Sequence, residues 1–218
     1  GAFAIPIIES LLKKPQRMYA LVLAPTRELA FQISEQFEAL GSVIGVKCAV
    51  AVGGVDMVQQ AILLAKRPHV LVGTPDYLSR VAVSGKLQLQ NVNAMVIDEA
   101  DAFVRKRGKD MSEDSRNALN AFLFRTGTPS TDVMVVFASN LPELFDSAVH
   151  DRVDEIVQFP LPALEERRKI LQEYVKEMQE PLPRKGFFQP APPPITLDDG
   201  VTDDMIIKAA DKCEGFSA

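Results

Sequence analysis

Short apolar runs separated by amphipathic stretches constrain the fold of this chain more than any other feature. Four runs in the first half have the length and composition of buried strands: residues 19–24, 49–52, 69–73 and 94–97. After the first run, Leu29, Ile33 and Phe37 recur at helical spacing. Strands that alternate with helices predict a parallel sheet covered on both faces. The expected fold class is therefore α/β.

Polar, turn-forming residues follow each of these four runs. They are Pro25-Thr26-Arg27-Glu28, Gly53-Gly54, Thr74-Pro75 and Asp98-Glu99-Ala100-Asp101. The carboxyl ends of parallel strands lie at one edge of a sheet, and ligands of such sheets bind there. We therefore expect a functional site at this edge.

At this expected site, the adjacent acids Asp98 and Glu99 are the residues suited to phosphoryl-transfer chemistry. In phosphoryl transfer the first carboxylate can hold Mg²⁺, directly or through water, and the second can polarise the attacking water. A strand that ends in two acids is common and by itself favours no function. The longer Asp-Glu-Ala-Asp string, beside the other polar clusters, favours the catalytic interpretation.

The second half of the chain predicts further elements of both kinds. A helix is expected around Leu119, Phe122 and Leu123, and an amphipathic helix over 164–178. The remaining expected elements are strands at 133–138 and 156–159, a short helix at 202–210 and a proline-rich loop at 181–194. These patterns predict two halves of one core, residues 1–97 and 98–160, followed by a partial helical lid over 161–218.

Charge is distributed unevenly around a net value of −5. Residues 1–97 carry nine basic and six acidic residues, and residues 98–218 carry fifteen and twenty-three. The first part can therefore tolerate a polyanion, whereas the second would repel one. The two cysteines, Cys48 and Cys213, offer neither a disulfide framework nor metal-ligand spacing.

In their order and spacing, the four polar clusters resemble the motifs of DEAD-box RNA helicases. The resemblance implies a P-loop nucleoside triphosphatase that uses ATP and Mg²⁺, with Asp98 and Glu99 at the nucleotide and Asp98 holding the metal through water. It also implies contacts with the RNA sugar-phosphate backbone. These would come from Pro25, Thr26, Arg27, Glu28, Gly53, Gly54, Thr74 and Pro75.

The sequence departs from the DEAD-box pattern in three places. No Gly-Lys-Ser/Thr string occurs, so the family's phosphate-binding loop is missing. Asp76-Tyr77 stands where the family has Gly-Arg, and Ala138-Ser139-Asn140 stands where it has Ser-Ala-Thr. We therefore expect this chain alone to bind ATP weakly and not to turn it over. The missing loop's strand would also leave unpaired edges inside the sheet.

A second set of strings occupies residues 97–103, 119–123 and 138–140. On these strings the sequence from about residue 95 onward is similar to AAA+ ATPases, most of all to mitochondrial inner-membrane members. This second resemblance implies that Asp98 and Glu99 form a Walker B motif and that Asn140 is a sensor for the γ-phosphate. It makes Arg152 an arginine finger that reaches a neighbouring subunit in a homo-oligomeric ring. The end of the chain, 215–218, looks like the start of a segment that carries a further arginine.

Three functional alternatives follow from the two resemblances. The first is an ATP-dependent RNA helicase core, placed in the nucleus, nucleolus or cytoplasm. The second is an oligomeric AAA+ ATPase of mitochondrial type. The third is an inactive fusion or misassembled product, in which a helicase-like half (about 1–101) meets an AAA+-like half (about 95–218).

No apolar run approaches the ~20 residues of a membrane helix.

Overall fold

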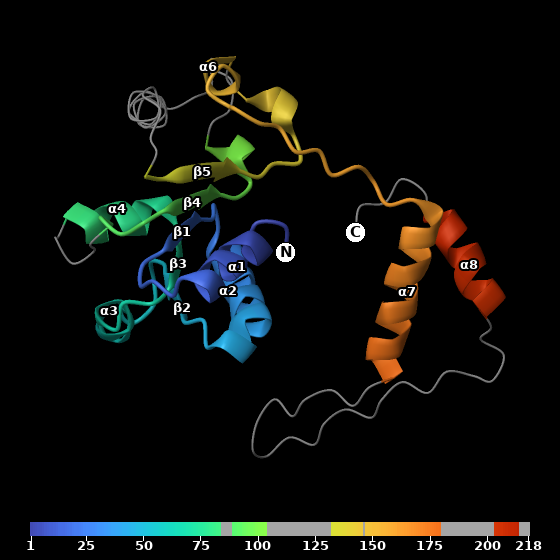
Figure 1. Cartoon of the computed structure of the whole chain (residues 1–218), viewed down its shortest axis with the longest axis horizontal. Helices are drawn as coiled ribbons and strands as arrows, with labels where there is room; N and C mark the ends of the chain where they lie inside the picture. Colours follow the sequence, from blue (N-terminus) through green and yellow to red (C-terminus); the bar gives the residue numbers. More distant parts are fainter. Residues whose placement is uncertain (84–88, 104–131, 146, 180–202, 214–218) are drawn as a thin grey trace. The chain divides into compact units, whose positions relative to one another are not determined.

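The computed structural model describes residues 1–83, 89–103, 132–145, 147–179 and 203–213 (Figure 1). The chain divides into two compact units, Gly1–Asp154 and Glu155–Ala218. Each unit is described by itself. The predicted boundaries at 97/98 and 160/161 stay predictions.

The first unit is built on a five-stranded sheet in the order β2-β3-β1-β4-β5. Its strands are β1 (Ala20–Leu23), β2 (Cys48–Ala51), β3 (Val70–Gly73), β4 (Ala94–Ile97) and β5 (Met134–Phe137). Every neighbouring pair is parallel, and the strands are aligned from their first residue to their last. Leu23 of β1 therefore lies opposite both Gly73 and Ile97. This arrangement confirms the predicted α/β fold with a parallel sheet.

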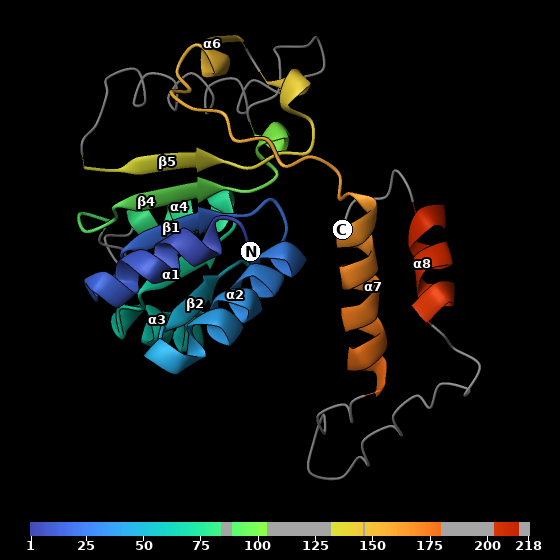
Figure 2. The ribbon, with the colours of Figure 1, turned by 45° about the vertical axis from the view of Figure 1, so that its right-hand side comes forward.

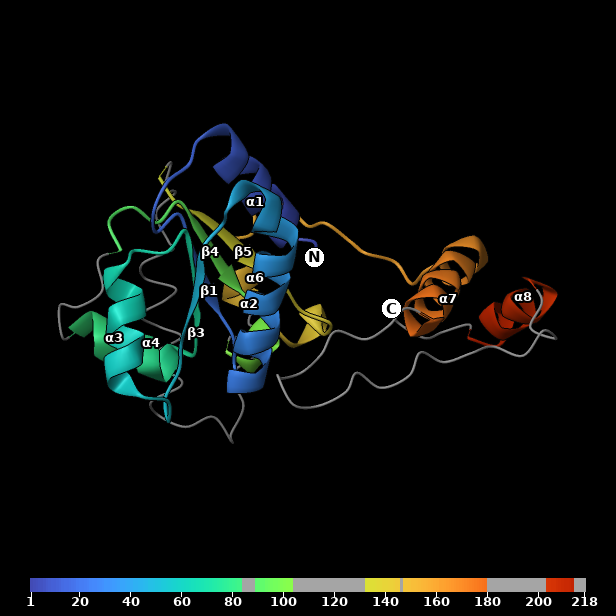
Figure 3. The same ribbon diagram turned by 90° about the horizontal axis from the view of Figure 1, so that it is seen from below.

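Helices cover both faces of the sheet (Figure 3). Helices α1 (Ala4–Lys13) and α2 (Arg27–Gly41) lie on one side, and α3 (Met57–Ala65) and α4 (Pro75–Val83) lie on the other. The first unit also contains four short helical segments. They are η1 (Ser42–Ile44), between α2 and β2, and η2 (Ala100–Ala102), η3 (Pro142–Leu144) and α6 (Ser147–His150), after β4. The layers explain why the central strands read as continuous apolar runs, since both of their faces are buried.

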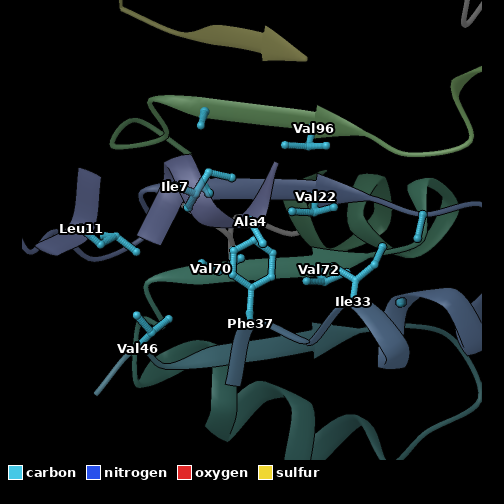
Figure 4. Packing of buried hydrophobic residues seen from close by; sticks show 14 of the residues in the cluster. Ala4, Ile7, Leu11, Val22, Ile33, Phe37, Val46, Val70, Val72 and Val96 are labelled. Carbon is cyan, nitrogen blue, oxygen red and sulfur yellow. The ribbon is translucent and has the colours of Figure 1, made fainter. Parts of the chain in front are cut away.

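Side chains of each strand alternate between two apolar layers. Val22, Val70, Val72 and Val96 face α1 and α2, where they pack against Ile33 and Phe37 (Figure 4). Leu21, Leu71, Ala49 and Ala51 face the other way and pack with Leu78 of α4. A third cluster at the β5 side holds Ile97, Ala100, Phe145 and Val149. The core therefore fixes the sheet and, with it, the positions of the strand ends.

The second unit contains two packed helices, α7 (Leu164–Gln179) and α8 (Asp203–Lys212). Arg167 of α7 joins them, because its Nε donates to the backbone oxygen of Ala210 at 2.8 Å. Ala210 is fully buried. Both helices confirm the helical expectation for 164–178 and 202–210.

Some expectations about elements are wrong, and others fall outside the described residues. Residues 156–159 form no strand; Ile156 and Phe159 are 69% and 76% exposed, and no described strand pairs with them. Helices α1 and α4 were not among the expected elements. The helix around residues 119–123 and the proline-rich loop at 181–194 lie outside the part that the structure describes.

The expected gap inside the sheet is also absent among the described strands. Each of the five strands bonds directly to its neighbour, so the ladder is continuous from β2 to β5. The open edges are the outer sides of β2 and β5. In this arrangement a further strand could pair only at one of these two outer edges.

Candidate functional site

The predicted polar clusters lie together at the carboxyl edge of the sheet. The strand arrowheads point to this edge in Figure 2. Backbone hydrogen bonds extend the ladder past the strand ends: Ala24 N–H donates to Gly73 at 3.0 Å, and Thr74 N–H donates to Ala51 at 3.3 Å. On the other side, Asp98 N–H donates to Leu23 at 3.0 Å. These bonds place the segments after β1, β2, β3 and β4 side by side, as the sequence predicted.

Three helices begin at this edge and turn their amino termini toward it. Helix α2 is capped by the Thr26 hydroxyl, which accepts from the N–H of Leu29 at 3.2 Å. Helix α3 is capped by the Asp56 carboxylate, which accepts from Val58 at 2.8 Å. Helix α4 starts at Pro75, a residue favoured at the first helical position. The cap of α2 is a neutral hydroxyl and the cap of α3 is a carboxylate. Glu28 and Asp76 add acidic side chains in the first turns of α2 and α4.

The Gly53-Gly54 turn after β2 is shaped by its lack of side chains. Gly54 has a φ of +78°, which disfavours other residues. A β-carbon placed on Gly54 would lie only 3.0 Å from Cζ of Arg27. The turn therefore lets the exposed Arg27 guanidinium come close to the backbone. Thus Arg27 and Gly54, predicted from separate motifs, are in direct proximity.

Gln60 of α3 supports this turn, although no sequence pattern points to it. The side chain is 3% exposed. Its Oε1 accepts from Val52 N–H at 3.0 Å, and its Nε2 donates to the Val52 oxygen at 2.8 Å. One amide thus satisfies both backbone groups of the residue that precedes the two glycines. Gln60 is therefore a positioning residue for the turn.

Asp98 lies at the end of β4, beside a hollow between the starts of α1 and α2. The hollow is lined by Gly1, Phe3, Ala4, Leu29, Gln32, Ile33, Gln36, Phe37 and Asp98. Partial burial raises the pKa of the Asp98 carboxyl, and a hydrogen bond from Glu99 N–H at 3.1 Å partly offsets that effect. The carboxylate is thus held at the rim of a hollow, close to the beginning of α1.

The rest of the acidic motif turns away from the strand. Glu99 is exposed and has a φ of +47°, an uncommon conformation for a residue with a side chain. Asp101 accepts a 2.6 Å hydrogen bond from the hydroxyl of Ser139, and Ala100 N–H donates to Ala138 at 2.8 Å. The segment after β5 therefore holds the acidic motif through Ser139, a contact that no sequence pattern predicts.

Asn140 and Arg152 were predicted as sensor and arginine finger. Asn140 is exposed and follows β5 at the same edge as Asp98. Arg152 is exposed just after α6, where its N–H donates to Val149 at 3.0 Å. Neither position tests the predicted role, and both roles stay predictions.

The residues at this edge fit part of a Mg²⁺–ATP site. A single carboxylate such as Asp98 suits Mg²⁺, which keeps several waters and takes its other ligands from phosphates. Within the described segments, no group of three or more His, Cys, Asp or Glu side chains could hold a metal without such help. Among these residues, Asp98 could hold such an ion.

No helix of the described residues has the length and apolarity to cross a bilayer.

Comparison with known proteins gives one family for this sheet unit. The sequence profile described as DEAD/DEAH box helicase matches residues 1–139. Over 102 residues the chain is 57% identical to the ATP-dependent rRNA helicase RRP3 of Coccidioides immitis (strain RS). It is 58% identical over the same length to the probable ATP-dependent RNA helicase DDX47 of Mus musculus. Each match covers 46% of this chain and 22% of the relative, so the chain spans about a fifth of the curated relatives it matches.

Solved structures of the same kind share the fold. An ATP-dependent RNA helicase from Sulfolobus tokodaii, described as hypothetical, superposes with a TM-score of 0.53 at 21% identity, over 79% of this chain and 52% of that one. The yeast DEAD-box splicing factor Prp28 superposes with a TM-score of 0.55 at 20% identity, over 83% and 46%.

The family match continues to residue 139, well past the expected join near residues 95–101. The comparisons give no support for a fused AAA+ half, for a Walker B motif of that family, for a ring or for a mitochondrial location.

Proposed function

The chain belongs to the DEAD/DEAH box helicase family, and from this membership we propose that its sheet edge binds single-stranded RNA beside a Mg²⁺–ATP site. In this proposal the chain supplies part of an ATP-dependent RNA helicase core. The whole activity is proposed rather than assigned, because the chain spans about a fifth of its relatives.

One observation carries the RNA-binding part of the proposal: the Arg27 guanidinium lies against the Gly53-Gly54 turn. A guanidinium donates hydrogen bonds in a fork that matches phosphate oxygens. Pro25-Thr26 and Thr74-Pro75 follow β1 and β3 at the same edge, where Thr26 is exposed and the other three are partly buried. Contacts of this kind fix the strand without reading its sequence. We propose RNA-backbone binding for these residues together with Glu28, which follows Arg27 in the first turn of α2.

The test measures binding of a fluorescein-labelled U12 RNA to the 218-residue chain by fluorescence anisotropy. Arg27→Ala should weaken binding about 5-fold to 10-fold, because a charge-assisted contact to phosphate is lost. Arg67→Ala is the matched control, since Arg67 is an exposed arginine that precedes β3 at the opposite edge of the sheet. Equal effects of the two substitutions would contradict the proposed RNA surface.

For the nucleotide we propose that Asp98 holds Mg²⁺ through water and that Glu99 orients the attacking water. Bound ATP would supply the phosphoryl group, and Asp98 and Glu99 would act only on the ion and the water. The printed sequence holds no Gly-Lys-Ser/Thr string, so we propose weak ATP binding and no turnover by this chain alone. Saturable Mg²⁺-dependent ATP hydrolysis that Glu99→Gln abolishes would contradict this.

The names of the relatives narrow the proposed substrate. RRP3 is named an rRNA helicase, and DDX47 a probable RNA helicase. We propose ribosomal RNA as the substrate class and the nucleus or nucleolus as the location. The mitochondrial alternative depended on the AAA+ resemblance.

A further inference from the structure

We propose that Arg80 of α4 forms, together with Arg27 of α2, an arginine pair that binds consecutive phosphates of one RNA strand across the Gly53-Gly54 turn. This inference rests on the proposed RNA-binding function and adds a residue to it. Arg80 belongs to none of the polar clusters that the sequence singled out.

The two guanidinium groups flank the same turn. On one side, Arg27 Nη2 lies 3.2 Å from the place that a β-carbon of Gly54 would occupy. On the other, Arg80 Nη2 lies 3.6 Å from the corresponding place on Gly53. Because neither glycine has a side chain, the surface between the arginines is bare backbone. A sugar-phosphate strand could therefore reach both cations.

Tyr77 helps to hold Arg80 in place. The Arg80 Cζ lies 5.8 Å from the centroid of the Tyr77 ring, within the range of a cation–π interaction. The two residues are three positions apart on α4 and so lie on one helical face. Tyr77 is itself partly buried against the cluster that contains Leu71 and Leu78. The guanidinium therefore packs over a partly buried ring, which restricts the rotamers of the Arg80 side chain.

Both arginines keep their donors available. Across the described segments, neither guanidinium forms a hydrogen bond or an ion pair. Three acids lie nearby in the sequence: Glu28, Asp56 and Asp76. Asp56 is occupied as the cap of α3, where it accepts from Val58 and Gln59. Each guanidinium can thus offer its planar set of N–H donors to a phosphate.

Arg80 also places a cation near a position where this chain departs from the DEAD-box pattern. The DEAD-box resemblance places a phosphate-contacting arginine at position 77, where this chain has Tyr77. Arg80 lies about one helical turn further along α4, where it reaches the Gly53 side of the turn. The chain thus retains a cation at this part of the edge and uses the tyrosine to support it.

The experiment measures U12 affinity for the full 218-residue chain by anisotropy, at several salt concentrations. Arg80→Ala should weaken binding about 5-fold and reduce the slope of log K against log salt by about 0.7, the value for one phosphate contact on a single strand. Arg80→Lys keeps the charge, so it should keep the slope while losing about 2-fold in affinity. Arg67→Ala should change affinity by less than about 2-fold. A thermal melt of each variant checks that the fold is intact.

Each outcome decides between the two proposals. A loss for both Arg27→Ala and Arg80→Ala, with Arg67→Ala unchanged, supports the arginine pair. A loss for Arg27→Ala alone overturns the role of Arg80 and leaves the RNA surface standing. Equal small losses for Arg80→Ala and Arg67→Ala also overturn it, because they indicate general charge attraction. If the full chain does not bind U12 at all, both proposals fail.

Discussion

At the scale of single residues, Asp98 is a charged group whose partial burial lowers the stability of the fold. Its carboxylate sits at the end of a buried strand, and burial raises its pKa above the ordinary value for aspartate. Its one described hydrogen bond comes from the neighbouring Glu99 N–H. Carboxylates with perturbed pKa values that lie beside a hollow are typical of functional sites. Charge at this position is therefore better explained by the proposed Mg²⁺ role than by stability.

Asp98→Asn should stabilise the fold at neutral pH in the absence of Mg²⁺ and nucleotide. Because the folded-state pKa is raised, the folded state binds the proton more tightly than the unfolded state does. The wild-type chain therefore loses stability as pH rises from the unfolded pKa through the folded one. Since Asp98 is partly exposed, we expect a gain of only about 0.5 to 1 kcal/mol for the asparagine variant.

Urea unfolding at pH 7 and near pH 4 measures this difference. The stabilisation should be largest at pH 7 and should shrink at the lower pH, where the wild-type carboxyl is increasingly protonated. Asp76→Asn is the comparison, since Asp76 is an exposed acid in the first turn of α4. An Asp98→Asn variant that is less stable than wild type at pH 7 would show that the carboxylate stabilises the fold.

Site residues could be predicted from the sequence where their position depends on residues next to them in the chain, and not where it depends on contacts between distant segments. Asp98 follows β4 directly, and Arg27 begins α2 four positions after the end of β1, so the strand pattern alone brings both to the edge. Ser139 and Asp101 are 38 positions apart, and their 2.6 Å hydrogen bond exists only because β4 and β5 pair. Arg80 likewise meets Gly53 only through the packing of α4 on the sheet. Contacts of this second kind leave no short-range sequence pattern.

At the scale of elements, the joint between β2 and α3 determines where the two glycines lie. Gln60 projects from α3 and bonds both backbone groups of Val52, at 3.0 and 2.8 Å. These are buried polar groups that would otherwise lack partners, and such groups are costly to leave unpaired. The helix and the strand end are thus joined by one side chain.

Gln60→Ala should destabilise the sheet unit by about 2 to 4 kcal/mol, because it leaves the Val52 N–H and C=O buried without partners. RNA affinity should fall as well, since the Gly53-Gly54 turn loses its support. Urea unfolding and U12 anisotropy measure the two effects. Gln59→Ala provides the matched control, because Gln59 is the exposed neighbour on the same helix. A Gln60→Ala variant as stable as Gln59→Ala would mean that water replaces the amide.

Elements were predictable where one pattern was reinforced by its neighbours. The strands of the parallel sheet begin and end within about two residues of their predicted bounds, since apolar runs closed by polar turns leave little freedom. The run at 156–159 has the same β-forming residues, but no described strand pairs with it, and it is irregular. Pairing, which local propensity cannot supply, decides whether such a run becomes a strand.

At the scale of the whole molecule, the apolar cores and the proposed RNA surface belong to the same unit. The three hydrophobic clusters draw their residues from the part before Asp154, and so do Arg27, Gly54, Arg80 and Asp98. The unit Glu155–Ala218 holds eight basic and twelve acidic residues, which leaves a net charge of −4. It therefore contributes negative charge but none of the proposed contacts with RNA.

A chain that ends at Asp154 should fold and should bind U12 at least as tightly as the full chain. It keeps every strand and every cluster of the sheet unit, and it sheds a net charge of −4 that repels a polyanion. At low salt the gain should be about 2-fold, and it should disappear as salt screens charges beyond roughly 10 Å. Circular dichroism, thermal melts and anisotropy measure fold and affinity together. Weaker binding by a folded, shortened chain would show that the helices α7 and α8 take part in the RNA surface, whereas loss of the fold would show that the sheet unit depends on them.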